Sequence, residues 1–277
     1  MAKLNLKKAD NQSATEKIIL NGTLPAKRPI RWELFTIPLV FVAFIAAWYG
    51  AIAGFGIKNY ILPTPDQTAY SLWYLATQPT FWGHVVVTLR EAAMGFLLGT
   101  GTAIFFGTFI STIPIVRKTL LPYIIGWQSV PHLPLAPLLV VWFGFGETSK
   151  VLMAAIVAFF PIFVAIIDGL NSSKQAQLDM LRVFGGRPLD IFLRVRLPNA
   201  LPYFFTGVNV GVIMALLGAV VAEWIGASAG LGHLLLAYNY DFQISSMFGV
   251  LIYLGAFGIL LHSLVRFARK KLVFWEA

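Results

Sequence analysis

Six long stretches without Lys, Arg, Asp or Glu constrain the fold of this 277-residue chain more than any other feature. A helix crosses the ~30 Å hydrocarbon core of a membrane with about 17–25 predominantly apolar residues. Each of the six stretches reaches that length. They predict an all-α membrane protein with about six transmembrane helices, at residues 34–57, 92–116, 119–146, 151–167, 197–222 and 242–265.

The composition excludes an ordinary soluble domain. Hydrophobic residues make up 58% of the chain, charged residues make up 12%, and the mean hydropathy is +0.75. Soluble domains carry about 25% charged residues. The chain has no cysteine, which excludes disulfides and thiolate metal sites. No histidine pair or acidic cluster has the spacing of a metal or catalytic site, so no metal is expected.

The basic residues are distributed unevenly among the loops. If the N-terminus lies in the cytoplasm, 18 of the 21 Lys and Arg residues fall on the cytoplasmic side, and only Lys58, Arg90 and Lys150 fall outside. Cytoplasmic loops of membrane proteins carry such an excess. The sequence therefore predicts that both termini are cytoplasmic, and the high pI gives no reason to expect nucleic-acid binding.

Small residues recur at every fourth position in two of the predicted spans. Residues four apart share one helix face, and small side chains there let two backbones approach closely. The faces could pack within one subunit, or they could line a translocation interface or contact a second copy. They comprise Gly95, Gly99, Ala103, Gly107 and Ser111 in one span, and in the other Gly207, Gly211 and Ala215 followed, after a shift of one residue, by Gly218, Ala222 and Gly226.

The third predicted span contains Pro131, Pro134 and Pro137. Proline removes a backbone donor and clashes with the preceding turn, so this helix must kink or unwind. Unpaired backbone is not tolerated in lipid, so the break should face protein or a water-filled cavity. Gln128 and His132 lie at the break, which could be a structural kink or a substrate site.

The charged segment 174–202 has the pattern of two short helices. Leu178, Leu181 and Phe184 follow helical spacing, and the Gly185-Gly186 pair should end that helix because glycine accepts a left-handed conformation. Pro188 suits the first turn of the next helix, which carries an apolar stripe of Leu189, Phe192 and Val195. This apolar ridge could be covered by the chain's own helices or by a partner subunit.

The same segment resembles the cytoplasmic loop of permease subunits in bacterial ABC importers, in the binding-protein-dependent branch that includes sulfonate, taurine, nitrate, bicarbonate and thiamine-precursor systems. The family motif is Glu-Ala-Ala, three residues, Gly, nine residues, then Ile-x-Leu-Pro. Gly185, Val195 and Leu197-Pro198 match it at the right spacing, whereas Asp179-Met180-Leu181 departs from the first triplet. Weaker matches extend the resemblance over about residues 85–265.

The resemblance implies the fold of a type I ABC importer transmembrane domain. It divides the chain into a cytoplasmic N-terminal arm (1–33), a first span with an outer interfacial segment (34–84), the transmembrane domain (85–268) and a cytoplasmic tail (269–277). The domain contains a cytoplasmic coupling loop at 171–199. The residues implied to couple to the ATPase are Asp179, Arg182, Phe184, Gly185, Gly186, Arg187, Val195, Leu197 and Pro198.

The resemblance also implies the partners. The chain would be a multi-pass protein of the bacterial inner membrane that works with a second copy of itself, two ATP-binding subunits and a periplasmic or lipid-anchored binding protein. ATP and magnesium would be bound by the ATPase, because the stretch from Gly144 to Lys150 lacks the Gly-Lys-Ser/Thr ending of a phosphate-binding loop. The chain itself would hold no cofactor and would not be an enzyme.

Polar residues in or near the spans are candidates for the translocation pathway, because such residues are costly in a membrane and often functional. A self-contained secondary carrier or channel is the alternative function. It is disfavoured because carriers often break helices in both of two inverted repeats, and here a single span is heavily broken. The pathway candidates are Arg90, Gln128, His132, Asn209 and Glu223.

Overall fold

The computed structural model describes residues 33–276, and all the regular structure within that range is helical. The predicted arm, residues 1–33, lies outside the described residues except for Glu33. The chain divides into two compact units between Gly50 and Ala51. Helix α2 (Glu33–Phe55) spans this division and provides an apolar stretch of 18 residues, as expected for the first span.

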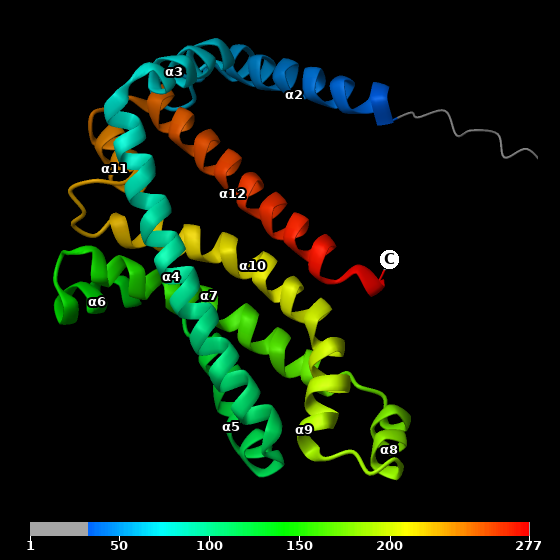
Figure 1. Ribbon diagram of the computed structural model, residues 1–277. Helices are drawn as coiled ribbons and strands as arrows, with labels where there is room; N and C mark the ends of the chain where they lie inside the picture. The colour runs from blue at the N-terminus through cyan, green and yellow to red at the C-terminus, as the bar shows by residue number, and fades with distance from the viewer. Residues whose placement is uncertain (1–32, 277) are drawn as a thin grey trace, which may run out of the picture. The chain divides into compact units, whose positions relative to one another are not determined.

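The second unit holds the remaining helices (Figure 1). Among the described residues of the whole chain, five helices, including α2, are long and apolar enough to cross a membrane. The helices of the second unit are α3 (Pro65–Thr77), α4 (Pro79–Thr112), α5 (Pro114–Gln128), α6 (Leu135–Phe143), α7 (Glu147–Asn171), α8 (Gln175–Val183), α9 (Pro188–Ile191), a π-helical turn (Phe192–Arg196), α10 (Leu197–Glu223), α11 (Leu231–Tyr240), α12 (Ile244–Leu272) and a short 3₁₀ turn (Phe274–Glu276).

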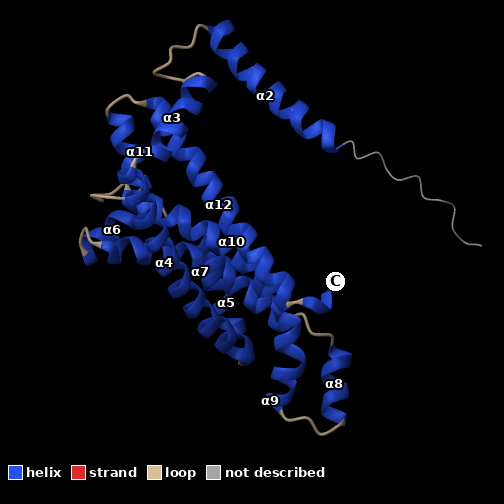
Figure 2. Cartoon of the chain, turned by 45° about the horizontal axis from the view of Figure 1, so that its top comes forward, coloured by secondary structure: helices blue, strands red, loops and turns tan. Residues whose placement is uncertain are grey.

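The core of this unit is a three-helix layer in which α7 packs against both α4 and α10 (Figures 1 and 2). Ile162, Phe163 and Ile167 of α7 are at most 2% exposed. Helix α12 lies on the outside, packed against α3, α10 and α11. Much of its surface is apolar and exposed, as expected for a helix that faces lipid.

The stripes of small residues on α4 and α10 pack against α7 within one subunit. A Cβ added at Gly99 of α4 would lie 2.6 Å from the carbonyl oxygen of Ala155, and one at Gly207 of α10 would lie 2.8 Å from that of Pro161. Such close approach requires glycine on both outer helices. Of the two interpretations of these stripes, the contacts support packing inside the subunit.

The third predicted span, 119–146, is two helices rather than one. Helix α5 ends at Gln128 and α6 begins at Leu135, so the prolines unwind the chain between them, as predicted. Neither piece is long enough to cross a membrane alone. On one side the break meets protein, since the rings of His132 and Phe160 lie 6.4 Å apart between centroids.

Other boundaries differ from expectation because charge alone does not end a helix. Helix α4 begins at Pro79 rather than at 92 and includes Arg90 and Glu91. These charges are tolerated because Glu91 is buried against protein and Arg90 forms an ion pair. Residues 227–245, where the glycines of the sequence predict an outer loop, are largely helical because they contain α11.

Candidate functional site

The loop predicted to couple to an ATPase is a helical hairpin at one end of the second unit (Figure 2). Helix α8 ends at Val183, and Gly185 follows with φ +74°, a left-handed conformation that favours glycine. The Gly186 N–H then donates to the Leu181 carbonyl at 2.9 Å. This bond and the left-handed Gly185 give the turn a defined shape, as the glycine pair predicts.

The second arm of the hairpin joins the span directly. Helix α9 begins at Pro188, and the Arg187 N–H donates to Oδ2 of Asp190 at 3.1 Å, which caps it. The helix continues through the π-helical turn into α10 without a break. A force applied to the turn would therefore act directly on the span.

The two faces of the hairpin differ in exposure. Leu178 is 6% exposed and Val195 is 9% exposed, so both pack inside the subunit. The ridge at the tip is open to its surroundings. We call the exposed set the coupling ridge, and it comprises Met180, Val183, Phe184 and Leu189, each more than 60% exposed.

Polar contacts hold α8 in place beside α10. The Asn199 side-chain amide donates to Oε1 of Gln177 at 3.1 Å and to the hydroxyl of Ser173 at 3.3 Å. Within α8, Arg182 donates to Asp179 at 2.8 Å. The coupling ridge therefore stands on an anchored helix.

A second polar cluster lies at the opposite end of the unit, where α4, α10 and α11 meet (Figure 1). Glu223 is 1% exposed, and its carboxylate accepts hydrogen bonds from the Thr88 hydroxyl at 2.6 Å and from the Gly232 N–H. The Gly230 N–H donates to Nδ1 of His84 at 2.9 Å. Glu223, a pathway candidate, is therefore bonded to the first turn of α11.

Two further charged side chains are buried near this cluster. Glu91 is 4% exposed and lies beside Glu223 and Lys150. Lys150, also 4% exposed, donates to the carbonyl oxygens of Gly146, at 3.0 Å, and of Phe145. Within the described part of the chain, Oε2 of Glu91 has no hydrogen-bond partner.

The structure does not bring the pathway candidates together. Arg90 is exposed and forms a double contact with Glu147, at 2.7 and 2.8 Å. His132 lies at the break between α5 and α6, and Asn209 lies on α10; a buried side-chain atom of each has no partner among the residues described. The side chain of Gln128 lies outside the described part of the structure.

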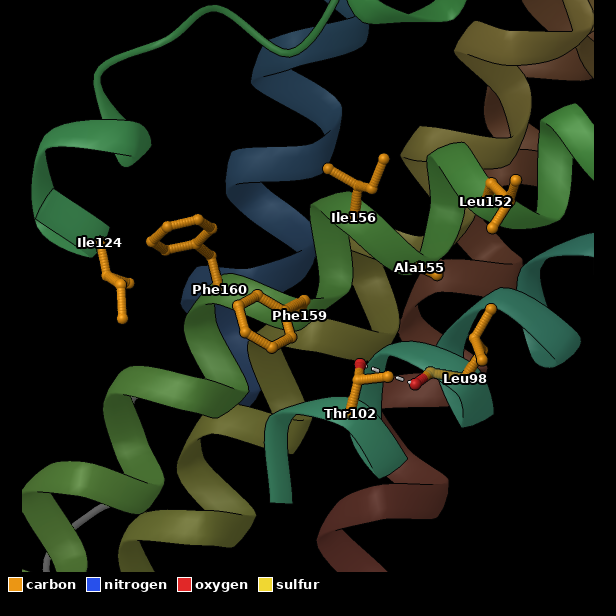
Figure 3. Close-up of a pocket in the computed structure, with 8 residues that line it drawn as sticks. All are labelled: Leu98, Thr102, Ile124, Leu152, Ala155, Ile156, Phe159 and Phe160. Atoms are coloured by element: carbon orange, nitrogen blue, oxygen red, sulfur yellow. Dashed lines mark hydrogen bonds between the residues drawn. The ribbon is translucent and has the colours of Figure 1, made fainter. Parts of the chain in front are cut away.

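An open apolar hollow of about 530 Å³ separates the broken span from α4 and α7. Figure 3 shows Thr102 among its lining residues, with its hydroxyl bonded to the carbonyl of Leu98 in its own helix. The hollow thus offers few polar groups to a ligand. Its lining comprises Leu98, Thr102, Ile124, Leu152, Ala155, Ile156, Phe159 and Phe160.

Residues 95–273 match the family described as "binding-protein-dependent transport system inner membrane component". The chain belongs to this family. It is thus an ABC importer permease and a multi-pass membrane protein, and the family works with a separate ATPase and a substrate-binding protein.

Individual relatives agree with this assignment. The permease is 37% identical to a probable ABC transporter permease of Haemophilus influenzae over 81% of this chain and 91% of that protein. It is 32% identical to a putative aliphatic sulfonates transport permease of Bacillus subtilis, over 86% of this chain and 87% of that protein. It is 30% identical to a riboflavin transport system permease of Chloroflexus aurantiacus, over 89% and 92%.

The fold is that of a known importer subunit. A chain of the inward-facing MetNI methionine ABC transporter superposes with a TM-score of 0.60 at 21% identity, over 73% of the permease and 99% of that chain. This likeness supports the fold of a type I importer transmembrane domain.

Sequence reasoning about the permease singled out Glu223 but missed its partners. Its partner Thr88, and the neighbouring His84 and Lys150 of the same cluster, are distant from Glu223 in sequence, and no local pattern joins them. Glu91 was visible as an acid next to Arg90, but a sequence does not show that Glu91 is buried while Arg90 is exposed.

Proposed function

We propose that this permease takes up ATP-driven motion through the coupling ridge and passes it to the translocation pathway through α10. The observation that carries this proposal is the exposure of Phe184, at 79%, on a helix anchored by Asn199. A large aromatic side chain exposed next to other apolar residues is typical of a protein contact.

The proposed assembly contains two copies of the permease, two ATP-binding subunits and a periplasmic or lipid-anchored binding protein. ATP and magnesium would be held by the ATP-binding subunits, so the permease itself would catalyse no reaction. Both termini and the coupling segment 174–198 would face the cytoplasm of a bacterial cell, with the protein in the inner membrane. The excess of basic residues on that side supports this orientation.

The transported solute would be a small organic or inorganic anion or a pyrimidine-type precursor. The relatives named for aliphatic sulfonates and for riboflavin are about equally similar to the permease, so similarity alone does not choose between their substrates. Asn209 and His132, each with a buried unpartnered polar atom among the described residues, are the pathway candidates with free hydrogen-bonding capacity. A ligand screen on the binding protein that accompanies the permease would identify the solute.

The coupling role is tested by co-purifying the ATP-binding subunit with permease variants. Phe184→Ala should lower the affinity for that subunit about fivefold or more, because buried aromatic anchors at interfaces cost more than ~1 kcal/mol when truncated. Phe105→Ala is the matched control, since Phe105 is 67% exposed within a span and cannot reach a cytoplasmic protein. The affinity of the Phe105→Ala variant for the ATP-binding subunit should stay unchanged.

Transport measurements complete the test. Uptake into vesicles should require ATP and should fall with Gly185→Pro, because proline cannot adopt the φ of +74° found there. Uptake that continued without ATP and collapsed with the ion gradient would overturn the proposal in favour of a secondary carrier. If Phe184→Ala and Phe105→Ala bound the ATP-binding subunit equally well, the coupling ridge would not be the contact surface for that subunit.

A further inference from the structure

A largely apolar pocket of about 550 Å³, with hydroxyl and guanidinium groups in its wall, opens where the last turns of α4 meet α8, α9 and the π-helical turn. Two hydroxyl side chains line it from α4, and two guanidinium groups line it from the hairpin. Apolar side chains complete the wall. The residues that matter for its chemistry are Thr108, Thr112, Arg182, Leu189, Phe192 and Arg196.

The pocket lies at a membrane surface, whichever way the protein is oriented. Helix α4 has 34 residues, and the continuous helix 188–223 has 36. Both are longer than the roughly 20 residues needed to cross the hydrocarbon core. The pocket is formed by the C-terminal end of one and the N-terminal end of the other, so it lies at the level of lipid headgroups.

Two hydrogen-bond donors in the pocket are free, whereas the Thr112 hydroxyl donates to the Phe109 carbonyl at 2.9 Å. Within residues 33–276, the Arg196 guanidinium and the Thr108 hydroxyl make no hydrogen bond or ion pair with another residue, and Arg196 is half-buried. Arg182 forms an ion pair with Asp179 at 2.8 Å. A half-buried guanidinium without an acceptor indicates a missing anionic partner.

The surroundings are basic. Residues 171–199 contain five basic and two acidic side chains. Both acids are engaged, because Asp179 pairs with Arg182, and Asp190 accepts from the Arg187 N–H and lies 3.9 Å from Arg194. The pocket therefore combines positive charge with no free carboxylate on the hairpin to repel an anion.

We propose that this pocket binds the phosphate of an anionic phospholipid headgroup. Arg196 and Thr108 donate to the phosphate oxygens, and the planar guanidinium suits two of those oxygens at once. Phe192 and Ile191 contact the glycerol and the first acyl carbons. Basic pockets between helices at a membrane surface bind anionic headgroups by the same chemistry. The bound lipid would link α4 to the coupling hairpin.

Native mass spectrometry on the full chain, purified with the subunits that accompany it, tests the proposal. The probes are palmitoyl-oleoyl phosphatidylglycerol, palmitoyl-oleoyl phosphatidylcholine and inorganic phosphate. One phosphatidylglycerol should bind per chain at least about fivefold more tightly than phosphatidylcholine, since a basic residue near an anionic surface contributes about that factor. Equal binding of the two lipids, or displacement of phosphatidylglycerol by millimolar inorganic phosphate, would overturn it.

Variants locate the site. Arg196→Gln should weaken phosphatidylglycerol binding about fivefold, whereas Arg194→Gln, two residues away and 75% exposed outside the pocket, should change it less than about twofold. Arg196→Lys keeps the charge and should bind at an intermediate level, which excludes misfolding as the cause. Equal losses in Arg196→Gln and Arg194→Gln would place the effect on general surface charge and overturn the site.

Discussion

Thr88 and Glu223 lie 135 positions apart in the sequence and are joined by a buried hydrogen bond of 2.6 Å. The same Thr88 hydroxyl accepts a bond from the Leu231 N–H at 2.7 Å, so one side chain connects α4, α10 and the start of α11. Both residues are at most 1% exposed. The contact fixes one end of the helix layer while the coupling hairpin forms the other.

Replacing Thr88 with valine should destabilise the permease. The change keeps the volume of the side chain but removes one of the two hydrogen bonds described for the Glu223 carboxylate and leaves the buried Leu231 N–H without its acceptor, which costs about 1–3 kcal/mol. The melting temperature in detergent should fall. Thr102→Val is the control, because the Thr102 hydroxyl bonds carbonyls of its own helix. Similar melting of the two variants would contradict the role given to Thr88.

Two glycines of α4 should respond in opposite ways to alanine. At Gly99 a Cβ would lie 2.6 Å from the Ala155 carbonyl oxygen, so α4 and α7 must separate, at a cost of about 1–3 kcal/mol. At Gly101, two residues along, a Cβ would meet nothing within 4 Å. Alanine there should stabilise the helix by about 0.5–1 kcal/mol.

Thermal unfolding of both glycine variants in the same detergent checks this pair. A loss of stability in Gly101→Ala that appeared only in the assembled complex would show that this face contacts another chain. Tolerance of alanine at Gly99 would mean that the close packing of α4 on α7 does not stabilise the fold.

Local rules predicted the hairpin correctly. The glycine pair and Pro188 act over a few residues. The structure has the left-handed Gly185 and the helix start at Pro188, and the first helix ends at Val183, just before Phe184 and the glycine pair. The three prolines predicted the break in the third span for the same reason, because proline acts on the turn that contains it.

Features that depend on distant residues were not predictable. The charge-free stretch beginning at 92 missed residues 79–91, more than three turns of α4, because whether Glu91 ends a span depends on its burial beside Glu223 of another helix. Helix α11 was expected as loop because of its flanking glycines. Gly230 at φ +119° instead forms the turn that brings the N–H of Gly232 to the Glu223 carboxylate.

The ion pair of Arg90 with Glu147 should contribute little to stability. Its side chains are 58% and 36% exposed, and exposed ion pairs contribute about 0–1 kcal/mol. A double-mutant cycle of Arg90→Gln and Glu147→Gln should give a coupling energy below about 1 kcal/mol. If Arg90 acts in the pathway, Arg90→Gln should lower uptake while Glu147→Gln does not. Equal uptake by both variants would leave Arg90 as an interfacial residue.

The two faces of α8 should separate folding from coupling. Leu178 is 6% exposed and Met180 is 62% exposed, although they are two residues apart on one helix. Leu178→Ala leaves a cavity beneath the helix and should cost about 2 kcal/mol or more, so amide exchange in 175–183 should accelerate. Met180→Ala should leave exchange unchanged and weaken binding of the ATP-binding subunit, because only an added chain can cover that side chain.

Amide exchange with and without the ATP-binding subunit checks this prediction. Adding the subunit should protect α8 from exchange in the wild type and in Leu178→Ala, and the protection should be reduced in Met180→Ala. Normal binding by Met180→Ala combined with loss of binding by Leu178→Ala would mean that the shape of the helix, and not its exposed apolar face, determines the contact.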